Sequence, residues 1–389
     1  MLRSQFDELI GHVLNQHPEL SDIVCTVGKP VQAEIYGQLH DVHLEPDPGD
    51  LVPWHTESMV ACLLSGNMRL YKDLVNSGSC DLSYELRGQG RFRVNIFHQQ
   101  GSLSVVMRKL PMKIPTMEEL NLPAVFQRML QEQYGLILVT GATGTGKSTS
   151  LAALINGINA RNCKHVLTLE DPIEFVHPHQ KGTINQRELG VDFDRFASGL
   201  RAALRQAPKV IMVGEIRDKE TVSIALEASE TGHLVLGTLH TGDTAQTVNR
   251  IIGMYEQHEE QLIRGRLAES LKYIVSQRLM PKPQGGRVAA FEVLINTLRI
   301  RELIMKGEDQ DKTFAGVLQS GSSQGMFTFD QYLADLFAQD IISEQIAMLN
   351  ASDKAALGQM LDKIKSKRGE KVTTIEGLEL DTEYGPESS

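Results

Sequence analysis

The sequence predicts an α/β protein in which a larger domain with a mostly parallel sheet follows a smaller α/β domain. From about residue 119, helical stretches alternate with apolar strand-like runs, namely LILVT, HVLTLE, KVIMVGE, HLVLGTLH and RVAAFEVL. This alternation is typical of crossover units, whose strands run parallel. The chain has 389 residues, more than one hydrophobic core usually supports, so we expect two domains.

We assign residues 1–110 to the smaller N-terminal domain. An amphipathic helix is predicted near its start, and one face carries Phe6, Leu9, Ile10, Val13 and Leu14. Next come predicted strands at DIVCTVG and VQAEIYGQL, helices at ESMVACLLSG and MRLYKDLVNSG, and a hairpin at GRFRVNIFHQQGSLSVVMRKL. Each of the two helices is followed by a glycine suited to a left-handed C-cap.

The remaining chain divides into three parts. A linker is predicted at 111–118, because the segment PMKIPTMEELNLP is rich in proline. The larger domain then takes 119–365 and becomes helical after about residue 310. We expect the acidic tail at 366–389 to have no fold of its own, because it contains too few apolar residues.

Composition excludes several classes of function. The formal net charge of −10 argues against a nucleic-acid binder, which needs a basic face. No apolar run is long enough for a membrane span, and the N-terminus has no secretory signal core. The isolated cysteines form no CxxC pair, so we expect buried thiols, no zinc and a reducing cytoplasmic location; they are Cys25, Cys62, Cys80 and Cys163.

A phosphate-binding loop is the most specific motif. GATGTGKS, from Gly141 to Ser148, fits G-x-x-x-x-G-K-[ST] between a predicted strand and a predicted helix. We expect Lys147 to reach the β- and γ-phosphates of ATP and Ser148 to ligate Mg²⁺. The residues expected to hold the nucleotide are Gly141, Ala142, Thr143, Gly144, Thr145, Gly146, Lys147, Ser148 and Thr149.

Carboxylates follow two other predicted strands. KVIMVGEIRD places Glu215 at a strand end, where it would hold Mg²⁺ or, alternatively, cap the next helix. TLEDPIEF places Glu170 and Glu174 after what we take to be a strand neighbouring the phosphate-loop strand. Hydrolysis needs a group that positions or deprotonates water, and the residues alone do not choose between Glu170 and Glu174.

Two further pairs of residues are candidates for the site. His233 and His240 flank the strand HLVLGTLH, where they are either structural or able to sense a γ-phosphate. In the hairpin, a loop from Gln99 to Ser102 would place Arg93 opposite Arg108. Like charges directly opposite each other are destabilising, so the two arginines either clamp an anion or form a solvated edge pair.

In combination, these motifs resemble the bacterial secretion and type IV pilus ATPases, and within them the pilus retraction ATPases of the PilT/PilU group. GATGTGKSTSLAALI is similar to the family's Walker A motif, and TLEDPIEFV to its Asp box. INQRELGVDFDRFASGLRAALRQAPKVIMVGEIRD resembles its Walker B signature, and ETGHLVLGTLHT its His box. The resemblance runs from about residue 20 to 350, and four motifs in this order are very specific.

The resemblance implies a PAS-like N-terminal domain, a RecA-like ATPase domain and a ring of six subunits. It places the family's catalytic glutamate on Glu174 and its Walker B glutamate on Glu215. Its histidines fall on His233 and His240, and its phosphate-binding arginines on Arg93 and Arg108.

The function implied is ATP hydrolysis that drives pilus retraction and twitching motility. The ring would act on an inner-membrane platform protein at the cytoplasmic base of the pilus. SSQGMFTFDQYL and GLEL resemble PilU more than PilT, which adds a PilT-like ATPase as a partner. The alternatives are a secretion or DNA-transfer motor and an accessory ring that depends on such a partner.

Overall fold

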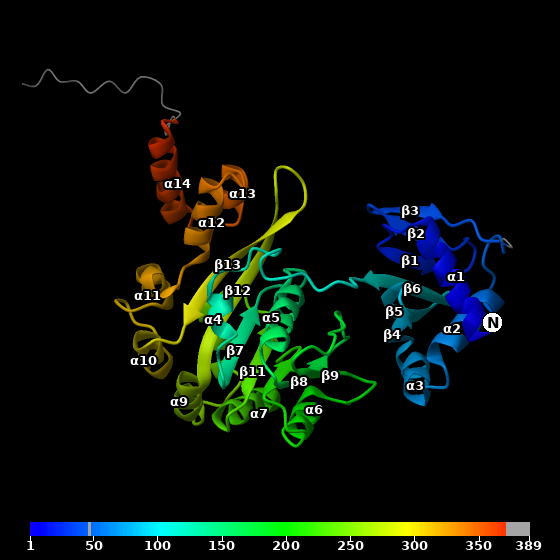
Figure 1. Cartoon of the computed structure of the whole chain (residues 1–389), viewed down its shortest axis with the longest axis horizontal. Helices are drawn as coiled ribbons and strands as arrows, with labels where there is room; N and C mark the ends of the chain where they lie inside the picture. The colour runs from blue at the N-terminus through cyan, green and yellow to red at the C-terminus, as the bar shows by residue number, and fades with distance from the viewer. Residues whose placement is uncertain (46–47, 371–389) are drawn as a thin grey trace, which may run out of the picture.

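The computed structural model describes residues 1–45 and 48–370, and it contains two β-sheets joined by an extended segment (Figure 1). The first sheet lies in the N-terminal part of the chain, and the second forms the centre of the larger part. The predicted tail lies largely outside the described residues.

The N-terminal sheet has six strands in the order β3-β2-β1-β6-β5-β4, and all neighbours are antiparallel. The strands are β1 (Asp22–Cys25), β2 (Gln32–Ile35), β3 (Gln38–Asp41), β4 (Ser79–Leu86), β5 (Gly90–Gln99) and β6 (Ser102–Leu110). Strand β4 is not among the predicted strands, although its alternating buried residues, Cys80, Leu82 and Tyr84, follow the period of a half-buried strand.

Three helices pack on this sheet, namely α1 (Arg3–Gln16), α2 (Pro53–Leu64) and α3 (Met68–Ser77). The predicted apolar face of α1 is buried in the N-terminal core, with Leu9 partly exposed. Gly78 caps α3 in the left-handed conformation, as expected, whereas Ser65 takes that role for α2 and Gly66 follows it.

The β5–β6 hairpin has the register that the sequence predicted. Gln99 pairs with Ser102 around a turn in which Gln100 and Gly101 have positive φ, and Arg93 pairs with Arg108. Because this register is fixed by the turn, both arginines lie side by side on one face of the sheet.

The second sheet has seven strands in the order β13-β12-β7-β11-β10-β8-β9. Six of them run parallel, whereas β13 is antiparallel to β12; RVAAFEVL is therefore an edge strand of a hairpin rather than part of a crossover unit. The strands are β7 (Gly135–Thr140), β8 (His165–Glu170), β9 (Thr183–Glu188), β10 (Val210–Val213), β11 (Leu234–Leu239), β12 (Leu271–Pro281) and β13 (Arg287–Ile295).

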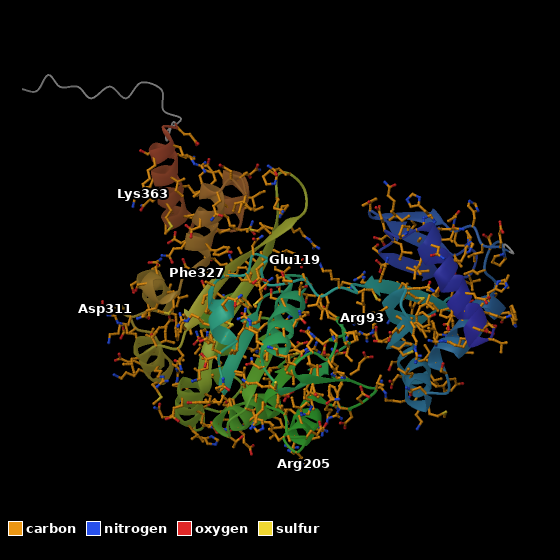
Figure 2. The ribbon with its side chains drawn as sticks, viewed as in Figure 1. Arg93, Glu119, Arg205, Asp311, Phe327 and Lys363 are labelled. Carbon is orange, nitrogen blue, oxygen red and sulfur yellow. The ribbon has the colours of Figure 1, made fainter. Side chains whose placement is uncertain are left out.

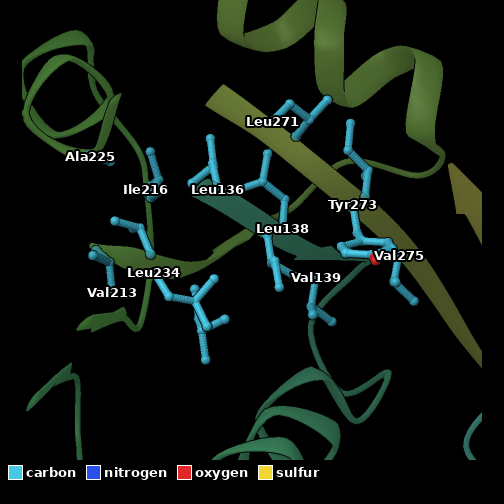
Figure 3. Packing of buried hydrophobic residues seen from close by; sticks show 14 of the residues in the cluster. Leu136, Leu138, Val139, Val213, Ile216, Ala225, Leu234, Leu271, Tyr273 and Val275 are labelled. Carbon is cyan, nitrogen blue, oxygen red and sulfur yellow. The ribbon is translucent and has the colours of Figure 1, made fainter. Parts of the chain in front are cut away.

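Helices cover both faces of this sheet, which explains why its central strands are apolar throughout. Figure 3 shows Leu136 and Leu138 of β7 packed among side chains of the neighbouring strands, including Leu234 and Val275. The helices are α4 (Val125–Met129), α5 (Lys147–Arg161), α6 (Phe196–Ala203), α7 (Lys219–Glu230), α8 (Thr244–Ile252), α9 (Glu260–Ser270), α10 (Leu298–Lys306) and α11 (Phe314–Ser320), with a 3-10 turn η1 (Ser322–Gln324) after them.

The last described helices form a separate apolar cluster against the β12–β13 hairpin. They are α12 (Phe329–Ala338), α13 (Glu344–Leu349) and α14 (Lys354–Arg368), and Phe329 lies at the centre with Met280 and Ala290 of the hairpin. Helix α14 ends at Arg368, so its last three residues belong to the segment 366–389 that we predicted to be an unfolded tail, and that boundary is wrong by three residues. Residues 371–389 lie outside the described part of the chain.

Two observations concern the whole described chain. None of its helices combines the length and apolar character that crossing a bilayer requires. Three of the four cysteines are buried as expected, but Cys163 is exposed, because it lies in the turn between α5 and β8.

Candidate functional site

The phosphate-binding loop connects the end of β7 to the start of α5. Gly141, Gly144 and Gly146 all have positive φ, a backbone conformation that residues other than glycine rarely adopt. Gly146 is the N-cap of α5, so the backbone N–H groups of the loop and the positive end of the helix dipole point to one place. The loop therefore has the geometry of an anion site.

The side chain of Gln277, on strand β12, hydrogen bonds to this loop and to the first turn of α5. Its side chain donates from Nε2 to the Thr145 carbonyl at 2.7 Å and accepts from Ser150 Oγ at 2.9 Å. A Cβ atom on Gly141 would lie 2.4 Å from the Gln277 carbonyl oxygen, so only glycine fits there. Gln277 is buried, and its contacts fix the loop against the sheet.

Lys147 is the cation of this loop, and it is only 8% exposed. Its Nζ donates to the carbonyls of Gly141 and Ala142, at 2.8 Å each. Burial lowers the pKa of Lys147, while Glu215 and Glu174 act in the opposite direction. A buried ammonium group with only carbonyl partners is well suited to receive a phosphate.

Glu215 follows β10 and faces the loop. Burial alone would raise the pKa of Glu215, but hydrogen bonds and charge from Arg217 and His240 outweigh it and the pKa is lowered. His240 Nε2 lies 3.1 Å from Glu215 Oε1, while its Nδ1 lies 3.5 Å from Thr143 Oγ1 in the phosphate loop. Asp218, not Glu215, caps helix α7, so the alternative reading of Glu215 as a helix cap is wrong.

The structure distinguishes Glu170 from Glu174. Glu170 is buried and accepts hydrogen bonds from Thr168 Oγ1 at 2.6 Å and Gln186 Nε2 at 2.9 Å. Burial raises the pKa of Glu170 to about 7 despite these hydrogen bonds. Glu174 is half-buried and lines the same cleft as Lys147 and Glu215. Glu174 is therefore the carboxylate that is placed to meet a ligand.

One expectation about this segment is wrong. Strand β8, which leads to Glu174, is not a neighbour of β7, because β11 and β10 lie between them. The carboxyl ends of all these parallel strands nevertheless meet at one edge of the sheet, which brings Glu174 and the phosphate loop to the same cleft.

The two histidines lie at opposite ends of strand β11. His240 follows the carboxyl end of β11 beside the phosphate loop, but His233 precedes the strand and hydrogen bonds through Nδ1 to the Ala228 carbonyl at 3.0 Å. A strand of this length separates its ends by roughly 20 Å. The structure therefore does not bring His233 to the nucleotide site of its own chain.

Arg93 and Arg108 line the cleft together with Lys147, Glu174 and Glu215. This cleft, of about 1560 Å³, lies between the two sheets, and Figure 2 shows Arg93 on the side of the N-terminal sheet that faces it. The charge repulsion in the arginine pair is relieved at both sides. Arg108 Nε donates to Asp22 at 2.9 Å, and Arg93 Nε lies 3.8 Å from Asp81.

The cleft also contains oxygen ligands of the kind that Mg²⁺ prefers. The Ser148 hydroxyl group is exposed at the start of α5, and the Glu215 carboxylate lies across from it. These two residues fit a magnesium ion that keeps water and phosphate oxygens as its other ligands. Across residues 1–45 and 48–370, no group of three or more His, Cys, Asp or Glu side chains could hold a metal ion, and the absence of zinc stays a prediction.

Sequence reasoning missed three buried polar residues near the site: Gln277, Arg91 and Glu188. The signal for Gln277 is the polar pair Ser276–Gln277 inside the apolar run YIVSQRLM, which was not recognised as a strand. Arg91 precedes Arg93 by two positions, so both face the same side of β5. No local pattern marks Glu188, because its partners are distant in the sequence.

The loop, the strand-end carboxylates and the parallel sheet are the features of an α/β ATPase domain. A family model described as type II/IV secretion system protein matches residues 80–326, more than half of the chain. The chain therefore belongs to the type II/IV secretion system protein family.

Individual relatives agree with this assignment. The chain is 42% identical to the pilus retraction ATPase PilT of Pseudomonas aeruginosa over 87% of this chain and 94% of that protein. It is 39% identical to the type IV pilus ATPase PilU of the same organism, over 88% of this chain and 87% of that protein. The crystal structure of the pilus retraction motor PilT with bound ADP matches with a TM-score of 0.80 at 40% identity, covering 90% of this chain and 98% of that chain.

These comparisons confirm the predicted group and the α/β fold, with an N-terminal domain followed by a RecA-like ATPase domain. The ATPase DotB of Legionella pneumophila has the same architecture, with a TM-score of 0.79 at 30% identity over 90% of this chain and 95% of that chain. The identities to PilT and PilU differ by too little to favour one of them.

Proposed function

We propose that this chain is the subunit of a hexameric motor that hydrolyses ATP to drive type IV pilus retraction. The observation that carries the proposal is the cleft, where Lys147 and Glu215 of the ATPase domain meet Arg93 and Arg108 of the N-terminal domain. The support for pilus retraction comes from relatives named for that activity, which align with most of the chain.

In this proposal, the phosphate loop binds ATP through the backbone N–H groups of residues 141–149 and through Lys147. Ser148 and Glu215 hold Mg²⁺, which would neutralise charge on the β- and γ-phosphates. Because Lys147 already lies in the loop, it needs only to exchange its two carbonyl partners for phosphate oxygens.

Glu174 orients or deprotonates the attacking water. It lines the cleft with the phosphate loop, and it makes no hydrogen bond to another residue of the described chain that would occupy its carboxylate. His240 bridges Glu215 and Thr143, so it is placed to sense the γ-phosphate. His233 is given no part in this mechanism, because it lies at the end of β11 away from the phosphate loop.

Arg93 and Arg108 close on the γ-phosphate from the other side of the cleft. The N-terminal domain then swings on the segment 111–118, and hydrolysis releases it. In a ring of six, successive closures would deform a central pore and turn an inner-membrane platform protein at the cytoplasmic base of the pilus.

A second candidate is a secretion or DNA-transfer motor. It is supported by 32% identity to the type II secretion system protein HxcR of P. aeruginosa over 70% of this chain and 62% of that protein. A third is an accessory ring that works with a PilT-like ATPase, which the similarity to PilU supports.

Gene deletion in the source bacterium separates these candidates. Loss of a retraction motor should stop twitching while pili accumulate on the surface, and wild-type protein but not Lys147→Ala should restore movement. Full twitching with a secretion defect would overturn the proposal in favour of the second candidate. Purified protein that hydrolyses ATP only when a PilT-like ATPase is added would identify the accessory ring.

A further inference from the structure

The backbone of Ile173, the residue before Glu174, is held by two buried charged side chains. The N–H of Ile173 donates to Glu188 Oε2 at 3.1 Å, and the carbonyl of Ile173 accepts from Arg91 Nη1 at 2.6 Å. Both backbone groups of the residue next to Glu174 are therefore fixed by side chains from other parts of the fold.

These contacts join the two domains. Arg91 lies on β5 of the N-terminal sheet, whereas Glu188 ends β9 and pairs with Glu170 at the end of β8. Arg91 Nη2 lies 3.6 Å from Glu188 Oε2, and Ser83 Oγ of β4 lies 2.9 and 2.8 Å from the two carboxylate oxygens of Glu188. We call Ser83, Arg91, Glu188 and Ile173 the interdomain clamp.

Burial makes this clamp sensitive to the position of the domain. Arg91 is 8% exposed and Glu188 is 6% exposed. Separating a buried ion pair leaves each charge without its partner, which is strongly unfavourable. When the N-terminal domain moves, Arg91 must therefore either carry the Ile173 carbonyl with it or lose its bond.

Strand β5 also connects the clamp to the nucleotide cleft. Arg91 and Arg93 are two residues apart on one face of the strand, which places their Cα atoms about 7 Å apart. Arg93 lines the cleft and Arg91 contacts the segment before Glu174. Because β5 is hydrogen-bonded on both sides, by β4 and β6, the two arginines move together.

We propose that Arg91 and Glu188 are positioning residues for Glu174, through which the placement of the N-terminal domain controls hydrolysis. Closure of Arg93 on the phosphates carries Arg91 along, and Arg91 moves the Ile173–Glu174 backbone. This inference rests on the proposed function, because it takes Glu174 as the residue that orients water.

The test compares steady-state ATP hydrolysis by Arg91→Ala in the full-length protein, with and without Glu174→Gln. In the otherwise wild-type protein, kcat should fall by about ten- to a hundredfold, because a small displacement of a reacting group has that effect. Binding of a fluorescent ATP analogue should change less than about twofold. In the Glu174→Gln background, Arg91→Ala should change the residual rate less than about twofold, because groups that act as a unit are not additive.

Matched variants separate positioning from general damage. Arg87→Ala removes an exposed arginine of the same domain and should leave kcat unchanged. Ser83→Ala removes one contact to Glu188 and should lower kcat less than Arg91→Ala does. If Arg91→Ala does not fold, Arg91→Lys and Glu188→Gln provide the same comparison, since each keeps part of the clamp.

Two results would overturn the inference. Equal loss of kcat in both backgrounds would show that Arg91 does not act through Glu174. Loss of analogue binding without loss of kcat would make Arg91 a phosphate ligand instead. Wild-type turnover by Glu174→Gln alone would contradict the proposed role of Glu174, a failure that is visible before Arg91 is altered.

Discussion

The two walls of the cleft are built in opposite ways. On the ATPase side, Lys147 is 8% exposed, and its loop is fixed to β12 by Gln277. On the N-terminal side, the Arg93 and Arg108 side chains are 49% and 71% exposed; Arg93 contacts the exposed Asp81, and Arg108 contacts the buried Asp22. One wall is organised before any ligand arrives, whereas the other consists of charges that can change partners.

This difference assigns separate tasks to the walls. A preorganised loop loses little entropy on binding, so it supplies most of the affinity for the nucleotide. Exposed ion pairs are worth little, typically up to about 1 kcal/mol, so Asp81 can release Arg93 at low cost. Asp22 is buried, so it holds Arg108 more firmly until an anion takes over the guanidinium. The phosphate loop therefore binds the nucleotide, and the arginines respond to it by changing partners.

The largest effect should come from the first wall. Lys147→Ala removes the only cation in the phosphate loop, and we expect loss of ATP-analogue binding and of hydrolysis, by about a thousandfold or more. Binding titration and a phosphate-release assay measure the two losses. Lys181→Ala, which removes an exposed lysine, is the control. Retained binding by Lys147→Ala would contradict this assignment.

The ATPase domain also contains a buried carboxyl group, Glu170, that should affect stability. The pKa of Glu170 is raised to about 7 in the folded state by burial, from 4.5 in an unperturbed carboxyl. Between these values the folded state keeps a proton that the unfolded state releases, so the free energy of unfolding should fall as pH rises. The loss approaches an order of 3 kcal/mol by pH 8.

Denaturant unfolding of wild type and Glu170→Gln, between pH 5 and 8, tests this expectation. Glutamine can still accept a hydrogen bond from Thr168, so the variant should lack the decline between the two pKa values. Parallel curves for the two proteins would show that Glu170 titrates normally in the folded state.

A smaller loss of ATP affinity is expected when Gln277, which hydrogen bonds to the phosphate loop, is replaced. In Gln277→Glu, a carboxylate oxygen would face the Thr145 carbonyl in place of the Nε2 donor. The cost of an unmade hydrogen bond is about 1–3 kcal/mol, so ATP should bind about five- to 150-fold more weakly. Ser150→Ala, which removes only the other contact of Gln277, should have a milder effect in the same titration. Unchanged affinity for Gln277→Glu would mean that the loop keeps its shape without this residue.

The arginine wall should give the smallest effect on affinity. Arg108→Gln is expected to weaken binding of a triphosphate analogue a few fold and to leave ADP binding unchanged, because an exposed charge acts at a distance and only on the γ-phosphate. The difference in triphosphate affinity between wild type and Arg108→Gln should shrink at high salt. An equal loss for ADP and the triphosphate would place Arg108 near the α- or β-phosphate.

Much of this site could be predicted from the sequence because its parts are local. The phosphate loop is a run of residues whose glycines and lysine are each needed at a fixed spacing. The pairing of Arg93 with Arg108 followed from one turn, since a hairpin register is set at its loop. The group assignment followed from four motifs in one order.

The remainder depends on contacts between distant segments. No sequence signal near His233 indicates that it lies at the end of the strand away from the phosphate loop. This follows only from the direction of β11, which runs parallel to β7. The order of the strands, which separates β8 from β7, is likewise a property of the whole fold. Glu188 meets Arg91 across 97 positions, and no local pattern could indicate that contact.

The central claim is that each nucleotide site is completed by the N-terminal arginines of its own chain. Arg93, Arg108, Lys147 and Glu174 of a single chain line one cleft, which supports action within the chain. The most direct measurement mixes two inactive proteins, Arg93→Ala and Glu174→Gln, under conditions in which subunits exchange.

If the arginines act within their own chain, every site in a mixed assembly still lacks one of the two groups, and ATP hydrolysis stays at the level of the separate variants. Subunit exchange is verified separately by energy transfer between labelled copies. If the arginines instead served the neighbouring subunit, some mixed interfaces would contain both wild-type groups. Recovered hydrolysis in the verified mixture would therefore contradict the account.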